Sequence, residues 1–163
     1  MRFRRLRQSS VVPTFADVID NSGNSPPSTR KANSLLEPSS AEFDAAARVV
    51  LGRFPLVFRR ELEGVVLRIA EFASDEQLAS LGIEDPYELT GLYEGVPLTE
   101  RSQWDSDGLP PIITLFRQPL LAEMEETGVT FAALIRHVVI HEAGHHFGLS
   151  DEDMHAIEAS GDD

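Results

Sequence analysis

The chain has 163 residues, 42% of them hydrophobic, and a formal net charge of −13, which suits one soluble domain with one core. It has no cysteine, which excludes a disulfide scaffold, a cysteine-rich zinc module and thiol catalysis. Its acidity argues against nucleic acid as a partner, and no apolar run reaches the roughly 18 residues of a membrane helix, so we expect no membrane partner and a cytoplasmic location.

Charge and composition both change near residue 40. Residues 1–40 carry +3, whereas residues 41–163 carry −16. The segment Asn21–Ser40 is rich in Ser, Asn and Pro and has too little apolar surface to offset the entropy lost on ordering. We therefore expect residues 1–40 to be a mostly disordered, basic tail and residues 41–163 to be the folded domain.

The first half of the folded region predicts two helices and a strand. A serine cap and a buried face spaced at helical intervals predict a helix over Ala41–Leu51, which Gly52 and Pro55 end. Alternating apolar residues predict a strand over Val65–Phe72. A second serine cap predicts a short helix over Asp75–Leu81.

Two further strands are expected. Leu89–Val96 predicts a short strand weakened by two glycines, and glycine inside a strand often marks a bulge or a close backbone approach. A polar loop is expected over Thr99–Pro111. Ile112–Phe116 is the clearest strand, and Pro119 limits its extension.

Two helices complete the pattern. Thr130 predicts the start of a long apolar helix over Phe131–Phe147, which Gly148 ends. Ser150 predicts a last helix over Asp151–Ala159. The order of helices and strands indicates an α+β fold, with a small sheet packed against helices.

The long helix carries the chemistry. His141 and His145 are four positions apart, so their imidazoles lie about 40° apart on one helical face and can bind one metal ion. Glu142 projects about 100° away, where it can take a proton from a metal-bound water as general base and return it as general acid. This is the HExxH arrangement of zinc hydrolases, and Zn²⁺ is the expected cofactor.

The motif continues as H-E-x-x-H-x-x-G-x-x-D. Gly148 can turn the chain at the helix end, and Asp151 can then supply a third, carboxylate ligand; the alternative is that Asp151 only favours the first turn of the last helix. Three other histidines are expected outside the ligand set. His137 fits a partly buried helix position, with the lining of the cleft as the alternative, and His146 faces the sheet or solvent. His155 is expected at the surface, with an approach to the site from the last helix as the alternative.

Three segments resemble the small bacterial zincin-like metallopeptidases, also called minimal zincins. Leu92–Arg101 is similar to the family segment GLYEGVPLTER, Leu109–Arg117 is similar to its LP..I.LFR segment, and Val139–Glu152 is similar to its HE..HHFG..DE signature. The resemblance covers about residues 41–158. It implies a minimal zincin-like α+β fold, zinc at His141 and His145 with Asp151 as third ligand, and Glu142 as the catalytic residue.

The surroundings of the expected site leave alternatives open. Tyr93 and Arg101 are candidates for stabilising the transition state, against cross-strand packing and a loop ion pair. Ile112–Arg117 is either the sheet edge that pairs with substrate or an inner strand. Met154 is expected to be a core contact rather than the methionine turn of metzincins, because it follows Asp151 too closely.

The leading hypothesis is a zinc-dependent metallopeptidase that acts on peptides or unfolded proteins through a zinc-bound water activated by Glu142. The alternative is a weak or inactive zincin-like module that binds metal and a protein partner; a metal hydrolase with a non-peptide substrate is a third reading. The negative domain favours basic peptides by electrostatic steering. The sequence does not predict an oligomeric state or a specific substrate.

Overall fold

The computed structural model describes residues 37–102, 108–150 and 152–154. Apart from residues 37–40, the expected tail lies outside the described residues, as do Asp151, His155 and most of the expected last helix. Among the described residues, no helix is long and apolar enough to cross a membrane. The helices and strands run in the order α2 (Ser40–Gly52), α3 (Leu56–Leu62), β1 (Val66–Ala70), α4 (Asp75–Leu81), η1 (Pro86–Glu88), β2 (Gly91–Glu94), η2 (Leu98–Glu100), β3 (Ile112–Phe116), α5 (Arg117–Thr127) and α6 (Phe131–His146).

A three-stranded sheet of order β1-β3-β2 forms the centre of the fold. β1 runs parallel to β3, with Val66 opposite Ile112, and β2 runs antiparallel to β3, with Gly91 opposite Leu115. β3 is therefore the inner strand, which decides the alternative that the sequence left open. Among the described strands, β2 pairs only on its β3 side and forms one edge of the sheet.

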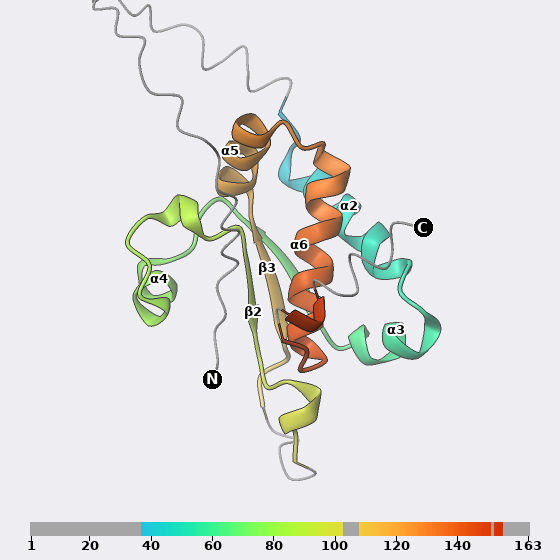
Figure 1. Ribbon diagram of the computed structural model, residues 1–163. Helices are drawn as coiled ribbons and strands as arrows, with labels where there is room; N and C mark the ends of the chain where they lie inside the picture. The colour runs from blue at the N-terminus through green and yellow to red at the C-terminus, as the bar shows by residue number, and fades with distance from the viewer. Residues whose placement is uncertain (1–36, 103–107, 151, 155–163) are drawn as a thin grey trace, which may run out of the picture.

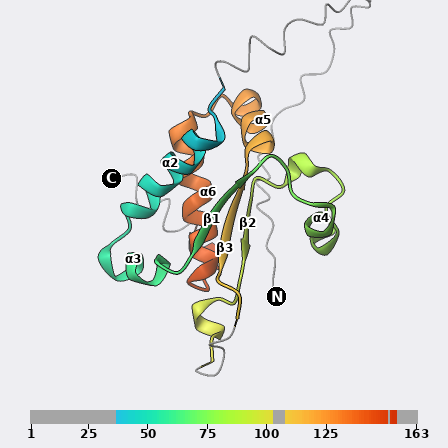
Figure 2. The same ribbon diagram turned by 180° about the vertical axis from the view of Figure 1, so that it is seen from behind.

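Helices cover both faces of this sheet unequally (Figures 1 and 2). The larger core lies between the sheet and the helices α2 and α6, where Ile113 and Leu115 of β3 pack with Val138 and Val139 of α6. A smaller core on the opposite face joins the alternate side chains of the strands to α4. This arrangement confirms the expected α+β fold with a small mixed sheet.

Reciprocal caps explain why two helices begin where the sequence predicts. The Ser39 hydroxyl accepts a hydrogen bond from the Glu42 amide at 3.3 Å, and the Glu42 carboxylate accepts one from the Ser39 amide at 2.7 Å. Ser74 and Gln77 form the same reciprocal pair of hydrogen bonds at the start of α4. Each cap satisfies two backbone groups that a helix start would leave unpaired.

Two helices, α3 and α5, were not expected. α3 follows Pro55, which offers no side-chain cap, and its apolar residues are mostly exposed, so no buried periodic face identifies it. α5 contains Pro119, the residue predicted to limit the extension of β3. The proline lies in the first turn of α5, where its missing N–H has no helical partner to lose. β2 is also shorter than the strand predicted over Leu89–Val96.

Candidate metal centre

The helix α6 presents the two metal-binding candidates side by side. Thr130 caps its start by accepting from the Ala133 amide at 3.3 Å, as predicted. The rings of His141 and His145 lie 4.9 Å apart between centroids and are inclined at 82°. Both residues are buried, with 3% and 7% of their surfaces exposed. The i, i+4 spacing therefore brings two imidazoles together, as the sequence indicates.

The side chain of Glu142 extends from α6 towards the edge strand β2. Its side chain is fully buried, and Gly91 of β2 is the backbone against which it packs. A methyl group added to Gly91 would lie 3.0 Å from the Glu142 Oε1 atom and 2.7 Å from Val138 Cγ1. The glycine therefore permits the close backbone approach that the sequence pattern suggested, and it places the edge strand directly beside the carboxylate.

Two glycines shape the end of the helix. Gly148 has a positive φ of 79°, and a methyl group there would overlap the side chain of Thr99. Gly144 lies under Met154, whose thioether occupies the space that a larger residue at 144 would need. Met154 is 2% exposed, which confirms the expectation of a core contact. The chain after α6 thus turns back and packs onto the helix between the two histidines.

His146 ties this end of α6 to two other elements. Its Nε2 atom lies 3.0 Å from the Glu61 carbonyl, and its Nδ1 atom lies 3.0 Å from the Tyr93 hydroxyl. Because a carbonyl only accepts, Nε2 carries the proton, and Nδ1 of the neutral ring accepts from Tyr93. Burial lowers the pKa of His146, which favours this neutral form. His146 faces the sheet, one of the two positions that the sequence allowed.

The structure places Tyr93 and Arg101 in this network. Tyr93 is 3% exposed, and burial raises the pKa of its hydroxyl while the charge of Arg101 opposes that rise. The Arg101 Nε atom donates to the Val96 carbonyl at 3.2 Å. Packing, the alternative weighed for Tyr93, is therefore present. The ion pair weighed for Arg101 is not found among the described residues, where Arg101 instead bonds to a loop carbonyl.

His137 extends the row of imidazoles along α6. Its ring centroid lies 6.1 Å from that of His141, and the residue is partly buried, as expected. Glu123 of α5 is near enough for the two groups to interact electrostatically. Burial raises the pKa of Glu123, and the charge of His137 opposes that rise. A carboxylate from another helix thus lies near this end of the histidine row.

The described residues fit a zinc site but supply only part of it. Buried, adjacent imidazoles on one helical face are nitrogen donors of the kind that Zn²⁺ takes, and a carboxylate is packed beside them. Within the described ranges, no three His, Cys, Asp or Glu side chains are grouped to hold a metal ion. The expected third ligand, Asp151, lies outside those ranges, and so does His155.

Comparison with known families agrees with this geometry. A family model described as zincin-like metallopeptidase matches residues 62–161, which include β1 to β3, the whole of α6 and the segment that follows it. The chain belongs to the zincin-like metallopeptidase family. A search of curated proteins finds no match to it.

Membership of the zincin-like family has two consequences for this chain. The activity class of the family is metal-dependent hydrolysis, which agrees with the histidine pair on α6. The match begins at residue 62, so α2 and nearly all of α3 precede it, although the sequence resemblance was expected to begin near residue 41. In this zincin-like chain, α2 nevertheless packs on α6 and completes the larger core.

Sequence reasoning did not find the partners of His146, nor the contact between Gly144 and Met154. The adjacent histidines at 145 and 146 were a visible signal, since neighbouring helical residues project about 100° apart and cannot both face the metal. The identity of the partners depends on how β2 and α3 pack against α6, which no local pattern carries.

Proposed function

We propose that this chain is a zinc-dependent metallopeptidase that cleaves peptide bonds in peptides or unfolded proteins. The observation that carries the proposal is the position of Glu142. Its carboxylate is buried against the edge strand β2 and stands next in sequence to a buried imidazole that can hold a metal. His141, His145 and Asp151 are the proposed zinc ligands.

The zinc ion, when bound, supplies a Lewis acid that lowers the pKa of water and polarises a carbonyl group. The residues of the chain supply the proton transfer. Glu142 accepts the proton that the attacking water loses and delivers it to the leaving amine, so one carboxylate acts first as base and then as acid. Its burial excludes bulk water from this exchange.

The outer edge of β2 is the proposed place for the substrate backbone. Among the described residues, no strand pairs with that edge. An extended peptide can add to an edge strand through main-chain hydrogen bonds, without demands on its side chains. A peptide held along β2 would lie near Gly91, which touches Glu142. This mode of binding favours unfolded segments over folded proteins.

The test is mass-spectrometric detection of cleavage in a diverse peptide library, with zinc-loaded protein. Glu142→Gln is expected to retain zinc and to lose cleavage by at least about 100-fold, since a general base contributes about 10²–10⁴-fold. Glu84→Gln, an exposed change of the same charge, should cleave like the parent. Cleavage that persists in Glu142→Gln, or a zinc-loaded parent that cleaves nothing, contradicts the proposal; the latter outcome supports a metal-binding module.

The ligand assignment has its own test in zinc affinity, measured by competition with a chelator. Asp151→Asn is expected to weaken zinc binding, because a charged carboxylate ligand becomes a neutral amide. Glu152→Gln, the neighbouring and exposed change of the same charge, should leave the affinity unchanged. Equal affinities in the two variants would remove Asp151 from the ligand set without deciding whether the chain is a peptidase.

A further inference from the structure

An open groove lies between α2 and α6, away from the metal ligands. It has a volume of about 810 Å³ and is lined mainly by apolar side chains, among them Val49 and Val50 of α2 and Ile140 of α6. Arg136, which also lines it, projects about 140° from His141 round the helix. We call this feature the α2–α6 groove. It occupies a different face of α6 from the proposed zinc site.

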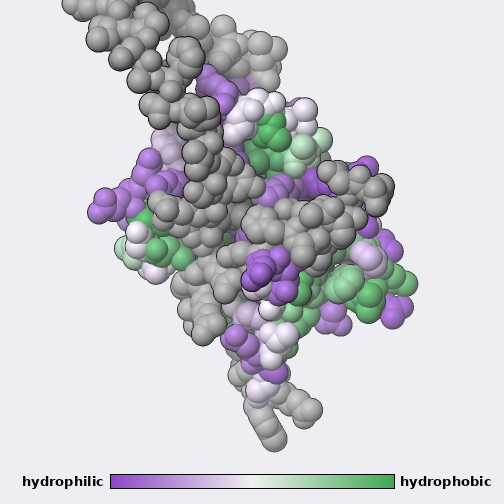
Figure 3. All heavy atoms as spheres, in the orientation of Figure 1, coloured by the Kyte–Doolittle hydropathy of each residue, from purple (hydrophilic) through white to green (hydrophobic). Residues whose placement is uncertain are grey.

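Exposed apolar side chains lie on the groove wall and directly after it in the chain. Val49 is 53% exposed, and Leu56 and Val57, at the start of α3, are 57% and 67% exposed. Figure 3 shows hydrophobic surface over α3 with hydrophilic side chains around it. Large apolar side chains that gather beside a concave surface and remain in contact with water indicate a place where another molecule binds.

The charge of the groove lining is opposite to that of the domain. The residues that line the groove include two arginines and no acidic residue, whereas residues 41–163 as a whole carry −16. Arg53 from the end of α2 and Arg136 from α6 both line the groove. Among the residues that the structure describes, neither forms an ion pair. Within the described ranges, two cations without acidic partners therefore lie beside an apolar surface.

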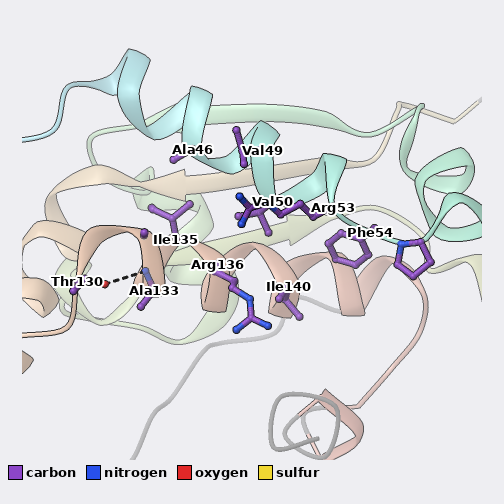
Figure 4. Close-up of a pocket in the computed structure, with 12 residues that line it drawn as sticks. Ala46, Val49, Val50, Arg53, Phe54, Thr130, Ala133, Ile135, Arg136 and Ile140 are labelled. Atoms are coloured by element: carbon purple, nitrogen blue, oxygen red, sulfur yellow. Dashed lines mark hydrogen bonds between the residues drawn. The ribbon is translucent and has the colours of Figure 1, made fainter. Parts of the chain in front are cut away.

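The order of side chains along the groove narrows the choice of ligand. Figure 4 shows Arg53 and Arg136 in its central part, with Ala46 and Ala133 towards one end and Phe54 and Ile140 towards the other. A fatty acid, with its carboxylate at one end, would leave one apolar end uncovered. A membrane presents a flat surface, which cannot fill a groove. A peptide segment with acidic side chains between aliphatic ones matches both features.

We infer that the α2–α6 groove is a docking site for an acidic, aliphatic segment of a partner protein. The aliphatic side chains of that segment bury the apolar walls, and its carboxylates pair with Arg53 and Arg136. Steering by the arginines makes the binding sensitive to salt. The inference does not depend on the peptidase proposal, because it uses a separate face of the molecule.

The test measures fluorescence anisotropy of two labelled synthetic helical peptides added to the full chain. Both carry leucines at positions i, i+3, i+4 and i+7; one has glutamates and the other lysines between them. Glu142→Gln is included throughout so that a peptidase leaves the probes intact. The glutamate peptide should bind and the lysine peptide should not. Arg136→Glu and Arg53→Glu should each weaken the binding at least about tenfold, which is about 1.4 kcal/mol.

Arg68→Glu is the matched control, because Arg68 is an exposed arginine on β1 and its change alters the net charge equally. It should weaken the binding by less than a factor of about two, given the screening of distant surface charges. The inference fails if Arg68→Glu acts as strongly as Arg136→Glu, or if both peptides bind alike. It also fails if neither peptide binds, including the case in which the chain binds phosphatidylglycerol vesicles through the same arginines.

Discussion

The hydroxyl of Tyr93 and the Nδ1 atom of His146 lie 3.0 Å apart in the core, joining the edge strand β2 to the last turn of α6. The opposite nitrogen of the same ring is bonded to the Glu61 carbonyl. One side chain thus fixes the helix that carries the proposed zinc ligands to two elements that are distant in sequence. It does so from the residue that follows the second proposed zinc ligand.

Tyr93→Phe is expected to lower the free energy of unfolding by about 1–3 kcal/mol, because it leaves a buried ring nitrogen without its donor. It should also weaken zinc binding, since the last turn of α6 loses one of its two anchors. Urea unfolding and chelator competition measure the two effects. Tyr87→Phe, a change of the same kind at an exposed residue, is the control. Equal stability of the two variants would show that the hydroxyl is not an anchor.

Gly91→Ala is expected to destabilise the fold by about 1–3 kcal/mol, the usual cost of adding a methyl group where packing is already tight. The new carbon would press on Val138 and on the Glu142 carboxylate. Gly52→Ala provides the contrast, because nothing lies within 4 Å of the position of its added carbon. That change in α2 should be neutral or slightly stabilising. Urea unfolding measures the free energy of unfolding of both variants. A Gly91→Ala variant as stable as the parent would contradict the close approach of β2 to α6.

Gly144 and Met154 are expected to be energetically coupled. Gly144→Ala alone should destabilise the protein by about 1–3 kcal/mol, because the added methyl group overlaps the Met154 thioether. The same change made in a Met154→Ala background should cost less, since the overlap is gone. A double-mutant cycle by urea unfolding measures the difference. Additive effects would mean that the two residues do not touch.

The stability of the chain is expected to depend on pH through Glu71. A hydrogen bond from Gln118 and the charge of Arg117 lower the pKa of Glu71 below its ordinary value of 4.5, against the opposing effect of burial. The unfolded chain therefore takes up this proton first as the pH falls. The stabilisation is fully present above pH 4.5 and disappears as the pH falls through the lowered pKa.

Urea unfolding at several pH values compares the parent with Glu71→Gln and with Glu63→Gln. The stability difference between the parent and Glu71→Gln should be largest above pH 4.5 and should shrink in more acidic solution. Glu63 is exposed and forms no ion pair within the described part of the chain, so Glu63→Gln should show no such trend. A constant difference for Glu71→Gln would refute the linkage.

If the chain is a peptidase, its net charge of −13 predicts faster cleavage of basic peptides at low salt. Raising the ionic strength from about 0.01 to 0.15 M shortens the Debye length from about 30 to 8 Å and should slow cleavage of a lysine-rich peptide. An acidic peptide with the same cleaved bond should be slowed less or accelerated. Equal salt dependence of kcat/KM for the two peptides would exclude electrostatic steering.

Local signals in the sequence predict much of this molecule. The bounds of α6 follow from Thr130 and Gly148, and the spacing of His141 and His145 places two imidazoles together once the segment is known to be helical. The two glycines of the strand predicted over Leu89–Val96 indicated a bulge or a close approach, and Gly91 shows the close approach, although the sequence did not indicate to which helix. These features depend on residues near one another in the chain, where capping, φ preference and helical periodicity act directly.

The features that were missed depend on tertiary packing. α5 begins at the end of β3 without a side-chain cap, and its Pro119 is acceptable only because it falls in the first turn. The inner position of β3 follows from pairing with β1 and β2 together, which neither strand reveals alone. The partners of His146 come from residues 53 and 85 positions away, beyond the reach of any local pattern.

The parallel pairing of β1 with β3 also sets an order of events during synthesis. Neither β1 nor β2 can pair until β3 has been synthesised, because among the described strands each of them pairs only with β3. Val66 of β1, for example, lies opposite Ile112 of β3. The helix that bears His141 and His145 leaves the ribosome later still. If the two histidines bind a metal as proposed, that binding can begin only after all three strands have been synthesised.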